Sequence, residues 1–239
     1  MTYSRKSALA VGVLFILTFI TSIGAVFAYG PVLSAGYITG AGADSGVYFG
    51  AFLELMLILT NIACATVLFP ILKRQNEALA LSYVGARIVE CTFILVGLLS
   101  LLTIVTLRQT GAGADQGTLT TIGSSLLATH NWTFLLGPGF ADGIGTGLIL
   151  GYLMYKSGLV GRRMALVGLV GGAMLTASGI AVLLGVIPQF GAVQGILTIP
   201  EFIWEAFLGL FLTFKDFKPS PVLAPESRER PTVPAYAAA

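Results

Sequence analysis

Six apolar segments of bilayer-crossing length constrain this chain more than any other feature of its sequence. About 20 helical residues are needed to cross a hydrocarbon layer of ~30 Å. Segments of this kind occupy residues 8–29, 47–72, 80–107, 132–155, 163–187 and 199–215. Charged residues make up 10% of the chain, compared with about 25% in a soluble domain. We therefore predict an all-α, polytopic transmembrane bundle of six helices, with the lipid bilayer as its surroundings.

Lysine and arginine residues predict the orientation of this bundle. If the N-terminus is cytoplasmic, the ends and loops on the cytoplasmic side hold 11 of the 13 Lys and Arg residues. Arg108 then lies on the outer side and Arg87 lies inside the third segment. Cytoplasmic loops of membrane proteins carry such an excess of basic residues. We therefore predict an N-in and C-in topology.

The two ends of the chain differ in character. Residues 1–28 have Arg5 and Lys6 before an apolar stretch, as a signal peptide does, but about 20 apolar residues exceed the 7–15 typical of a signal peptide. A retained first helix is therefore favoured over a cleaved one. Residues 216–239 contain five of the ten prolines and few apolar residues. We predict a transmembrane domain over residues 1–215 and a disordered, Pro-rich cytoplasmic tail over residues 216–239.

The outer segment 108–131 carries apolar residues on one helical face: Leu119, Ile122, Leu126 and Leu127. This pattern predicts a short amphipathic helix on the membrane surface.

Small residues recur every fourth position in two neighbouring segments. The fourth segment carries Gly139, Gly143, Gly147 and Gly151, and the fifth carries Gly168 and Gly172. In lipid, such spacing lets helix backbones approach closely. Two partners fit this glycine ladder, the neighbouring helix or a second subunit in a homo-oligomer. The short turn at 156–163 favours packing within the chain.

Polar side chains inside the apolar segments are the candidates for function, because each costs roughly 2.5–3.5 kcal/mol in the bilayer and usually faces a bundle interior. They are Glu54, Asn61, Arg87, Glu90, Asp142, Glu201 and Glu205. Arg87 and Glu90 are three residues apart and share a helix face, which fits either a structural ion pair or a functional role as a gate or as a substrate-anchoring charge. Glu54 and Asn61 are seven residues apart, again on one face.

The remaining acids have competing interpretations. Thr198 and Glu201 read as the capping box of the sixth helix, which explains Glu201 without a function; Glu205 lies one turn deeper and is the better candidate. The expected depth of Asp142 in the membrane depends on how Gly137-Pro138-Gly139 is interpreted. If this sequence starts the fourth helix, Asp142 lies near the surface. If it interrupts a longer helix, Asp142 lies deep, as in many transporter sites.

Several classes of function are disfavoured. The net charge is +2 without a basic stripe, so no nucleic acid partner is predicted. Cys64 and Cys91 read as apolar fillers. The one histidine, His130, is too few for bis-histidine haem or a histidine-rich zinc site, so neither cofactor nor metal is predicted. Ser178 and His130 make a poor Ser–His pair, so an enzyme is disfavoured and no catalytic residue is assigned.

Two stretches resemble a known family. They are ARIVE at 86–90, with its R-x-x-E pattern, and GYLMYKSGLVGR at 151–162 followed by GLVGG at 168–172. These resemble the bacterial multi-pass membrane family catalogued as domain of unknown function 4386. That family typically has proline before the arginine of this turn, where this chain has Gly161. The resemblance implies a six-helix plasma-membrane protein and no established activity.

Two hypotheses of different classes follow. In the first, the protein binds a small molecule or ion, as a transporter or sensor, and an acidic intramembrane cavity holds a cationic ligand. Its binding residues are Glu54, Asn61, Arg87, Glu90, Asp142 and Glu205. In the second, the protein is a non-catalytic membrane subunit that binds protein partners through the glycine-rich helix face and the tail.

Overall fold

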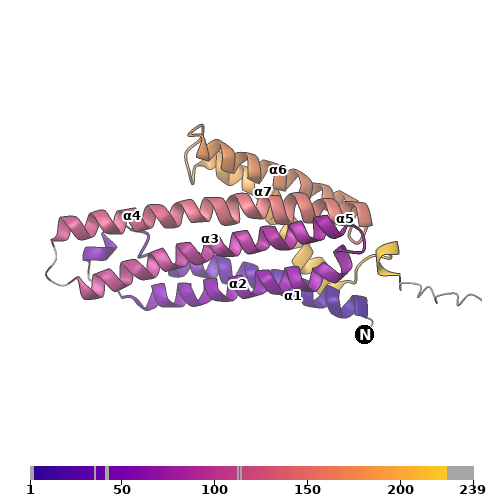
Figure 1. Cartoon of the computed structure of the whole chain (residues 1–239), viewed down its shortest axis with the longest axis horizontal. Coiled ribbons are helices and arrows are strands. Elements are labelled where there is room, and N and C mark those ends of the chain that lie inside the picture. Colours follow the sequence, from indigo (N-terminus) through magenta and orange to yellow (C-terminus); the bar gives the residue numbers. More distant parts are fainter. Residues whose placement is uncertain (1–2, 35, 41–42, 112, 114, 225–239) are drawn as a thin grey trace, which may run out of the picture.

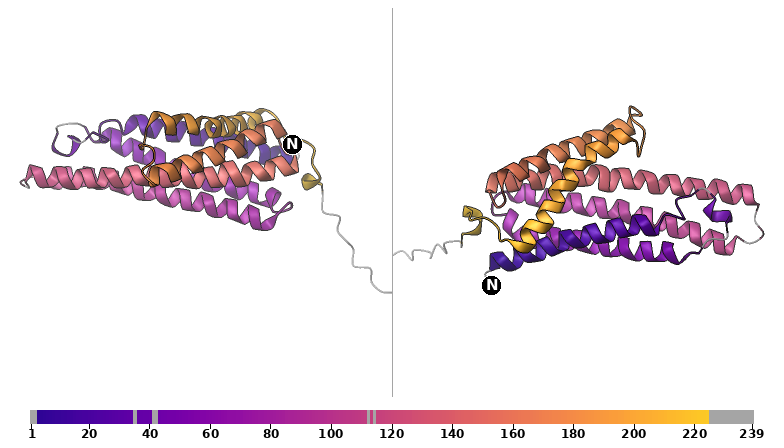
Figure 2. Two further views of the ribbon diagram at one scale, coloured as in Figure 1. Left: turned by 90° about the horizontal axis from the view of Figure 1, so that it is seen from above. Right: turned by 180° about the vertical axis from the view of Figure 1, so that it is seen from behind.

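The computed structural model of the protein describes residues 3–34, 36–40, 43–111, 113 and 115–224. Within these residues, six helices are long and apolar enough to cross a membrane. The first four spanning helices run along the long axis of the molecule, and the last two form a hairpin that is inclined to it (Figures 1 and 2). The predicted all-α, multi-pass membrane bundle is therefore confirmed.

The helices alternate in direction along the chain. They are α1 (Tyr3–Ala28), α2 (Ser45–Leu72), α3 (Glu77–Thr110), α4 (Gln116–Phe134) with its continuation into α5 (Gly151–Ser157), α6 (Arg162–Leu183) and α7 (Ala192–Phe214). The short 3-10 helices η1 (Tyr37–Thr39) and η4 (Pro221–Leu223) lie outside the spans.

The fourth spanning helix is one continuous rod from Gln116 to Ser157. Between α4 and α5 it passes through two π-helical segments, η2 (Leu135–Ala141) and η3 (Gly143–Leu150). Pro138 lies inside η2, where wider turns redirect the backbone hydrogen bonds: the N–H of Asp142 reaches Gly137 O, five residues back. Such π turns let a helix absorb a proline without breaking. The Gly-Pro-Gly sequence therefore neither starts nor interrupts this helix.

This continuity corrects the prediction of a surface helix at 108–131. Residues 116–134 form α4, which runs beside α3 and lengthwise along the bundle (Figure 1). Leu119, Leu126 and Leu127 pack against a core cluster there. At ~1.5 Å per residue, the 34 residues of α3 extend about 51 Å. Both rods therefore exceed the ~30 Å of hydrocarbon and project beyond it.

One end of the bundle, here called the basic end, contains the start of α1, the end of α7 and the turns α2–α3 and α5–α6. The guanidinium of Arg5 donates to the carbonyls of Leu212 and Thr213 at the end of α7, over 3.0 and 2.6 Å. The opposite end contains Arg108 and is called the Arg108 end.

Residues 216–224, which belong to the segment predicted as a tail, follow the surface of the basic end. Phe217 is buried, the N–H of Lys218 donates to Leu159 O over 2.8 Å, and Ser220 Oγ donates to Ser157 O over 2.7 Å. Residues 225–239, the rest of that predicted tail, lie outside the described residues.

The apolar core is divided into two clusters. The first lies toward the basic end and includes Phe15, Leu150 and Trp204, all fully buried. The second lies toward the Arg108 end and includes Tyr29 and Leu101. The buried polar residues Asn61 of α2 and Arg87 and Glu90 of α3 lie between the members of the two clusters along these helices. The division of the core therefore places the candidate site at mid-bundle.

Candidate functional site

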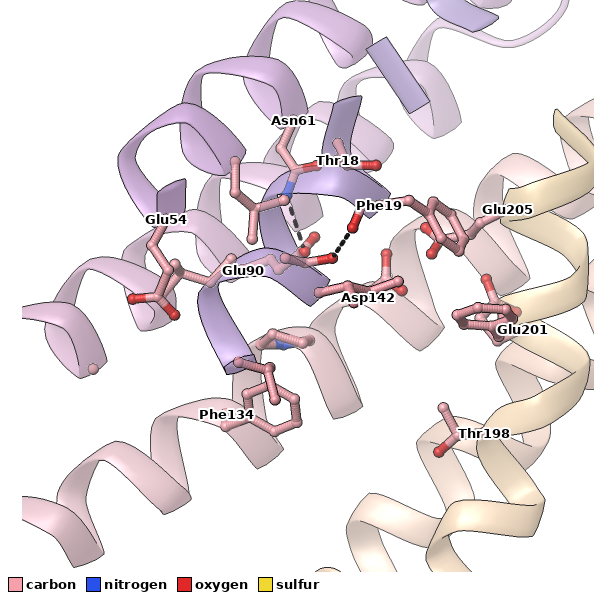
Figure 3. A pocket seen from close by; sticks show the side chains of 18 of the residues that line it. Thr18, Phe19, Glu54, Asn61, Glu90, Phe134, Asp142, Thr198, Glu201 and Glu205 are labelled. Carbon is pink, nitrogen blue, oxygen red and sulfur yellow. Dashed lines mark hydrogen bonds between the residues drawn. The ribbon is translucent and has the colours of Figure 1, made fainter. Parts of the chain in front are cut away.

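A cavity of about 270 Å³ lies between the two apolar clusters. Residues of α1, α2, α3, α4, η2, α6 and α7 contribute to its wall. Six of the lining residues are the ones that the sequence singled out for ligand binding: Glu54, Asn61, Arg87, Glu90, Asp142 and Glu205. Figure 3 shows side chains from separate helices converging on this space.

Arg87 is the centre of the largest polar network in the wall. Its Nη1 forms an ion pair with Glu90 Oε2 at 2.8 Å and another with Asp142 Oδ1. The same nitrogen donates to Thr146 Oγ1 at 2.8 Å, and Nη2 donates to Asn61 Oδ1 at 2.5 Å. Asn61 Nδ2 in turn donates to Glu90 Oε1 at 3.2 Å. Three helices are therefore joined through one guanidinium.

Burial gives this network its energetic weight. The side chain of Arg87 is 2% exposed, and those of Glu90 and Asp142 are 6% and 9% exposed. Charges removed from water this completely need partners of opposite sign. The two carboxylates share a single guanidinium, so the network itself carries a surplus of acid.

Asp142 lies deep in the bundle. It is buried in the middle of the 42-residue rod, at the junction of η2 and η3. Its depth agrees with the second of the two interpretations of Gly137-Pro138-Gly139, although the helix is not broken there. The π turns rotate this part of the rod so that Asp142 and Thr146 both reach Arg87.

Glu54 lies nearer the Arg108 end and has its own partner. Tyr29 Oη donates to Glu54 Oε2 over 2.8 Å. The ring of Tyr29 packs edge-on against that of His130, with centroids 6.1 Å apart. His130 lines the cavity and is 8% exposed, and its Nδ1 has no hydrogen-bond partner among the described residues.

Glu201 does not cap a helix. Because α7 begins at Ala192, Thr198 lies inside the helix and its hydroxyl donates to Gln194 O over 2.9 Å. Glu201 is 1% exposed, and within the described residues neither of its carboxyl oxygens has a hydrogen-bond partner. The capping-box interpretation is therefore wrong, and Glu201 is a buried acid in the cavity wall.

Glu205 lies one turn from Glu201 on the same face of α7. Figure 3 shows both side chains projecting from α7 toward the side of the cavity where Asp142 lies. Glu205 is half-buried and lines the cavity. Within the part of the chain that the structure describes, it makes no hydrogen bond and no ion pair. It is therefore an acid that faces the cavity without a partner.

The glycine ladder lies where the fourth spanning helix crosses α6. A Cβ atom placed on Gly147 would be 2.3 Å from the Cα of Gly172, and one on Gly172 would be 2.5 Å from Gly143 O. A Cβ on Gly143 would be 2.8 Å from Thr176 Oγ1. Side chains larger than hydrogen do not fit here, so these three glycines allow direct backbone contact.

The other ladder glycines behave less uniformly. A Cβ on Gly151 would be 3.1 Å from Leu169 N, and one on Gly168 would be 2.7 Å from the Trp204 ring. Around Gly139 the nearest atoms are those of its own helix, the closest at 3.6 Å. Five of the six glycines therefore face other helices of the same chain.

Glycines also make room for Glu201. A Cβ on Gly147 would lie 2.6 Å from Glu201 Oε2, and one on Gly171 would lie 2.8 Å from the same oxygen. The carboxyl group is thus seated against two glycine backbones at the cavity wall. The recurrence of glycine at every fourth residue indicated that helix backbones approach closely. It could not indicate which side chain would occupy the space beside the glycines.

Sequence reasoning missed several polar residues in and around this wall, including three on α1, α4 and η3. Thr18 lines the cavity from α1, His130 lines it from α4, and Thr146 binds Arg87 from η3. Thr146 follows Asp142 by four residues, so it shares a helix face with it. His130 lay in the segment predicted to be a surface helix, which hid its role.

The wall offers cation-binding chemistry more readily than metal chemistry. Among the described residues, no three His, Cys, Asp or Glu side chains come together as metal ligands. The lining holds five carboxyl groups, from α2, α3, α7 and the fourth spanning helix, and one guanidinium. An organic cation complements such a lining by charge without requiring a fixed coordination geometry.

Comparisons with known proteins identify a family without an assigned activity. The family model described as "Domain of unknown function (DUF4386)" matches residues 10–215, which include most of the first span and all of the other five. No curated protein and no solved structure matches the chain.

Proposed function

The chain belongs to the family described as domain of unknown function DUF4386, and we propose that it binds a small cationic ligand in the mid-bundle cavity, as a transporter or a sensor. The observation that carries this proposal is Glu205. It is an acid that lines a cavity inside the membrane and has no partner among the described residues. Intramembrane acids are costly and are usually retained for ligand or ion binding.

The charge balance of the wall supports the same proposal. Arg87 is the one Lys or Arg side chain among the described residues of the wall, and its charge is already shared between Glu90 and Asp142. Carboxylates close together in a low dielectric repel one another strongly. A cation near Glu205 relieves this repulsion, whereas an anion increases it.

The cavity is suited to a small ligand. Its volume of about 270 Å³ lies just below the ~300–1,000 Å³ typical of small-molecule sites. The glycine face offers less support for the alternative role as a protein-binding subunit, since five of its six glycines already contact helices of the same chain.

We propose further that the basic end is cytoplasmic and that the bilayer is the bacterial plasma membrane. The two exposed ends of α3 test this orientation as a matched pair. In a background with Cys64 and Cys91 replaced by Ala, Thr110→Cys is expected to react with an impermeant maleimide on intact cells. Ala78→Cys is expected to react after permeabilisation alone, and the reverse pattern would invert the topology.

A binding measurement tests the ligand class. The full chain in lipid nanodiscs is titrated with methylammonium, tetramethylammonium and benzylammonium, and thermal unfolding is followed. A ligand at about 100 times its Kd stabilises a protein by roughly 2.7 kcal/mol, so binding is detectable as a raised Tm. We expect at least one of the three cations to raise the Tm of the wild-type protein.

Two variants make this measurement specific. Glu205→Gln removes the charge and keeps the shape, and it is expected to weaken cation binding about tenfold or more. Glu77→Gln changes an exposed acid in the first turn of α3 and is expected to leave binding unchanged. Equal binding by the wild type and Glu205→Gln, or no stabilisation by any of the cations, would refute the proposal.

A further inference from the structure

Helices α1 and α7 are in close contact near the basic end. A Cβ placed on Gly12 of α1 would lie 2.3 Å from Thr213 N of α7, and one on Gly209 of α7 would lie 3.3 Å from Phe15 Cβ. These two glycines let the helix backbones touch at this level. The cavity is therefore closed off from the basic end along this side.

Beyond this crossing the two helices separate. In the right-hand view of Figure 2, the C-terminal part of α7 crosses the N-terminal part of α1. From there the two helices diverge toward the α6–α7 turn. The last contact between aromatic rings is that of Phe19 with Phe202, whose centroids are 4.9 Å apart. The turn between α6 and α7 contacts α4 instead, since Gln189 Nε2 in this turn donates to Asn131 O of α4 over 2.6 Å.

The residues around this gap both line the cavity and lie exposed on the surface of the bundle. Ile23 and Val26 of α1 are 44% and 52% exposed, and Phe202 of α7 is 50% exposed. Phe134 of α4, on the third side, is 40% exposed. In a spanning bundle these apolar side chains face hydrocarbon. These four exposed apolar residues of the cavity lining, Ile23, Val26, Phe134 and Phe202, are here called the mouth.

The mouth and the wall are suited to contact two chemically different parts of one ligand. The mouth offers apolar and aromatic contacts, while the wall behind it offers carboxylates, among them the partnerless Glu205. Glu201 and His130 also line the cavity, and each has buried polar atoms without a hydrogen-bond partner in the described chain. Unsatisfied buried acceptors favour a ligand that brings N–H donors.

We infer that the cavity takes an amphiphilic organic ammonium ion that enters sideways from the bilayer between α1 and α7. Its charged nitrogen binds at Glu205, and its apolar part lies between Ile23 and Phe202. This inference rests on the proposed function and extends it by naming the ligand class and the route. Partition of the ligand into lipid supplies the apolar driving force, and the carboxylate supplies selectivity for charge.

The test compares octylammonium with methylammonium and with uncharged octanol, titrated into the full chain in nanodiscs with ligand concentrations expressed per lipid. Octylammonium is expected to bind to the wild type, and Glu205→Gln is expected to weaken that binding about tenfold or more. Binding of octanol that is as strong as that of octylammonium and independent of Glu205 would overturn the inference, because the mouth would then hold an apolar chain regardless of charge.

A matched pair of substitutions on α1 tests the route. Ile23→Trp fills the mouth, whereas Ile20→Trp adds the same bulk at a residue that is 60% exposed and does not line the cavity. Octylammonium binding is expected to fall about tenfold in the first variant and to stay unchanged in the second. Val26→Trp repeats the test from the next turn if Ile23→Trp does not fold.

The outcomes separate this inference from the function beneath it. If methylammonium or benzylammonium binds in a Glu205-dependent way while Ile23→Trp and Val26→Trp leave octylammonium binding unchanged, lateral entry is wrong and the proposed function stands. If none of the ammonium ions binds to the wild type, both fail.

Discussion

Two arginines of this chain meet carboxylates in different surroundings. Arg87 at mid-bundle pairs with Glu90 and Asp142, and all three side chains are less than 10% exposed. Arg108, near the end of α3, pairs with Asp44, and these side chains are 13% and 20% exposed. The mid-bundle cluster has two acids for one base, whereas at the other end of α3 the acid Asp44 has the base Arg108 beside it.

The Arg108 cluster is a structural clasp. Its Asp44 accepts hydrogen bonds from Tyr37 Oη at 2.5 Å and from Gln109 Nε2 at 2.8 Å. The guanidinium of Arg108 also lies over the Tyr37 ring, 4.6 Å from its centroid, and Arg108 Nε donates to Gly40 O over 3.1 Å. This cluster fastens the α1–α2 connection to the end of α3.

The difference teaches where negative charge is in surplus. At the Arg108 end the acid is saturated with donors, and water is near. At mid-bundle the acids outnumber the bases, and the side chains of Arg87, Glu90 and Asp142 are less than 10% exposed. A bound cation would reduce the repulsion between carboxylates at mid-bundle, and for this reason we propose the function there and not at the Arg108 end.

The largest expected effect is the loss of Arg87. Arg87→Met keeps an unbranched side chain but leaves Glu90 and Asp142 buried without their base. We expect the free energy of unfolding to fall by about 3–5 kcal/mol, measured by SDS-induced unfolding in mixed micelles. A loss below about 1 kcal/mol, as for an exposed pair, would erase the distinction between the two clusters.

The next largest effect is that Asp142→Asn is expected to change the free energy of unfolding in opposite directions in two backgrounds. In the wild type, Asp142→Asn removes a partner of Arg87 and is expected to destabilise the fold. In the Arg87→Met background the same substitution removes an uncompensated acid, and we expect it to restore about 1–2 kcal/mol. A double-mutant cycle on the same unfolding assay measures this coupling. Additive effects of the two substitutions would mean that the two side chains do not interact.

The clasp is expected to respond more weakly. Arg108→Met removes an ion pair that is partly exposed, so we expect a loss of about 1 kcal/mol or less, with clear dependence on salt concentration. Arg87→Met, assayed at the same salt concentrations, is the control and should show little salt dependence. A loss of about 3 kcal/mol or more at position 108 would place the clasp in the same class as the mid-bundle cluster.

The smallest effect is the pH dependence of the clasp. Hydrogen bonds from Tyr37 and Gln109, with the Arg108 charge, hold the pKa of Asp44 below its usual value of 3.8. A lowered pKa in the folded state contributes stability that is present above the unfolded pKa and is lost as the pH falls through the folded pKa. The wild type is therefore expected to lose more Tm than Asp44→Asn when the pH falls below about 4.

Tyr37 gives the opposite dependence at high pH. Burial, reinforced by the hydrogen bond to Asp44, raises the pKa of Tyr37 to about 12. Stability from a raised pKa is complete below the unfolded pKa of about 10 and is lost as the pH rises toward the folded one. Tyr37→Phe is expected to be less sensitive than the wild type between these values. Identical alkaline profiles would show that the Tyr37 hydroxyl is not held in the clasp.

Much of the fold followed from one-dimensional patterns. Segment length and hydropathy predicted six spans, and helical spacing predicted that Arg87 and Glu90 share a face, where they form an ion pair at 2.8 Å. The same reasoning failed at helix ends. Pro138 suggested a helix boundary, yet π turns carry the helix past it, and Thr198 suggested a cap although α7 begins at Ala192.

The site was predicted as a set of residues but not as an arrangement. Nothing in the spacing indicated that Asp142 binds Arg87, that Tyr29 binds Glu54, or that Glu205 stays without a partner. Those outcomes depend on how each helix is rotated and tilted relative to its neighbours. Gly147 and Gly172 set one such crossing through backbone contact, and the π turns rotate Asp142 toward Arg87.

Sequence alone determined that this polypeptide spans a membrane six times and that acids outnumber bases within the spans, because hydropathy and charge are properties of single residues summed over a bilayer's thickness. Tertiary structure alone decided which acids are paired with a base and which acid, Glu205, lines the cavity without a partner among the described residues. Those features depend on distances between helices, and such distances arise from close packing of whole surfaces that no local pattern encodes.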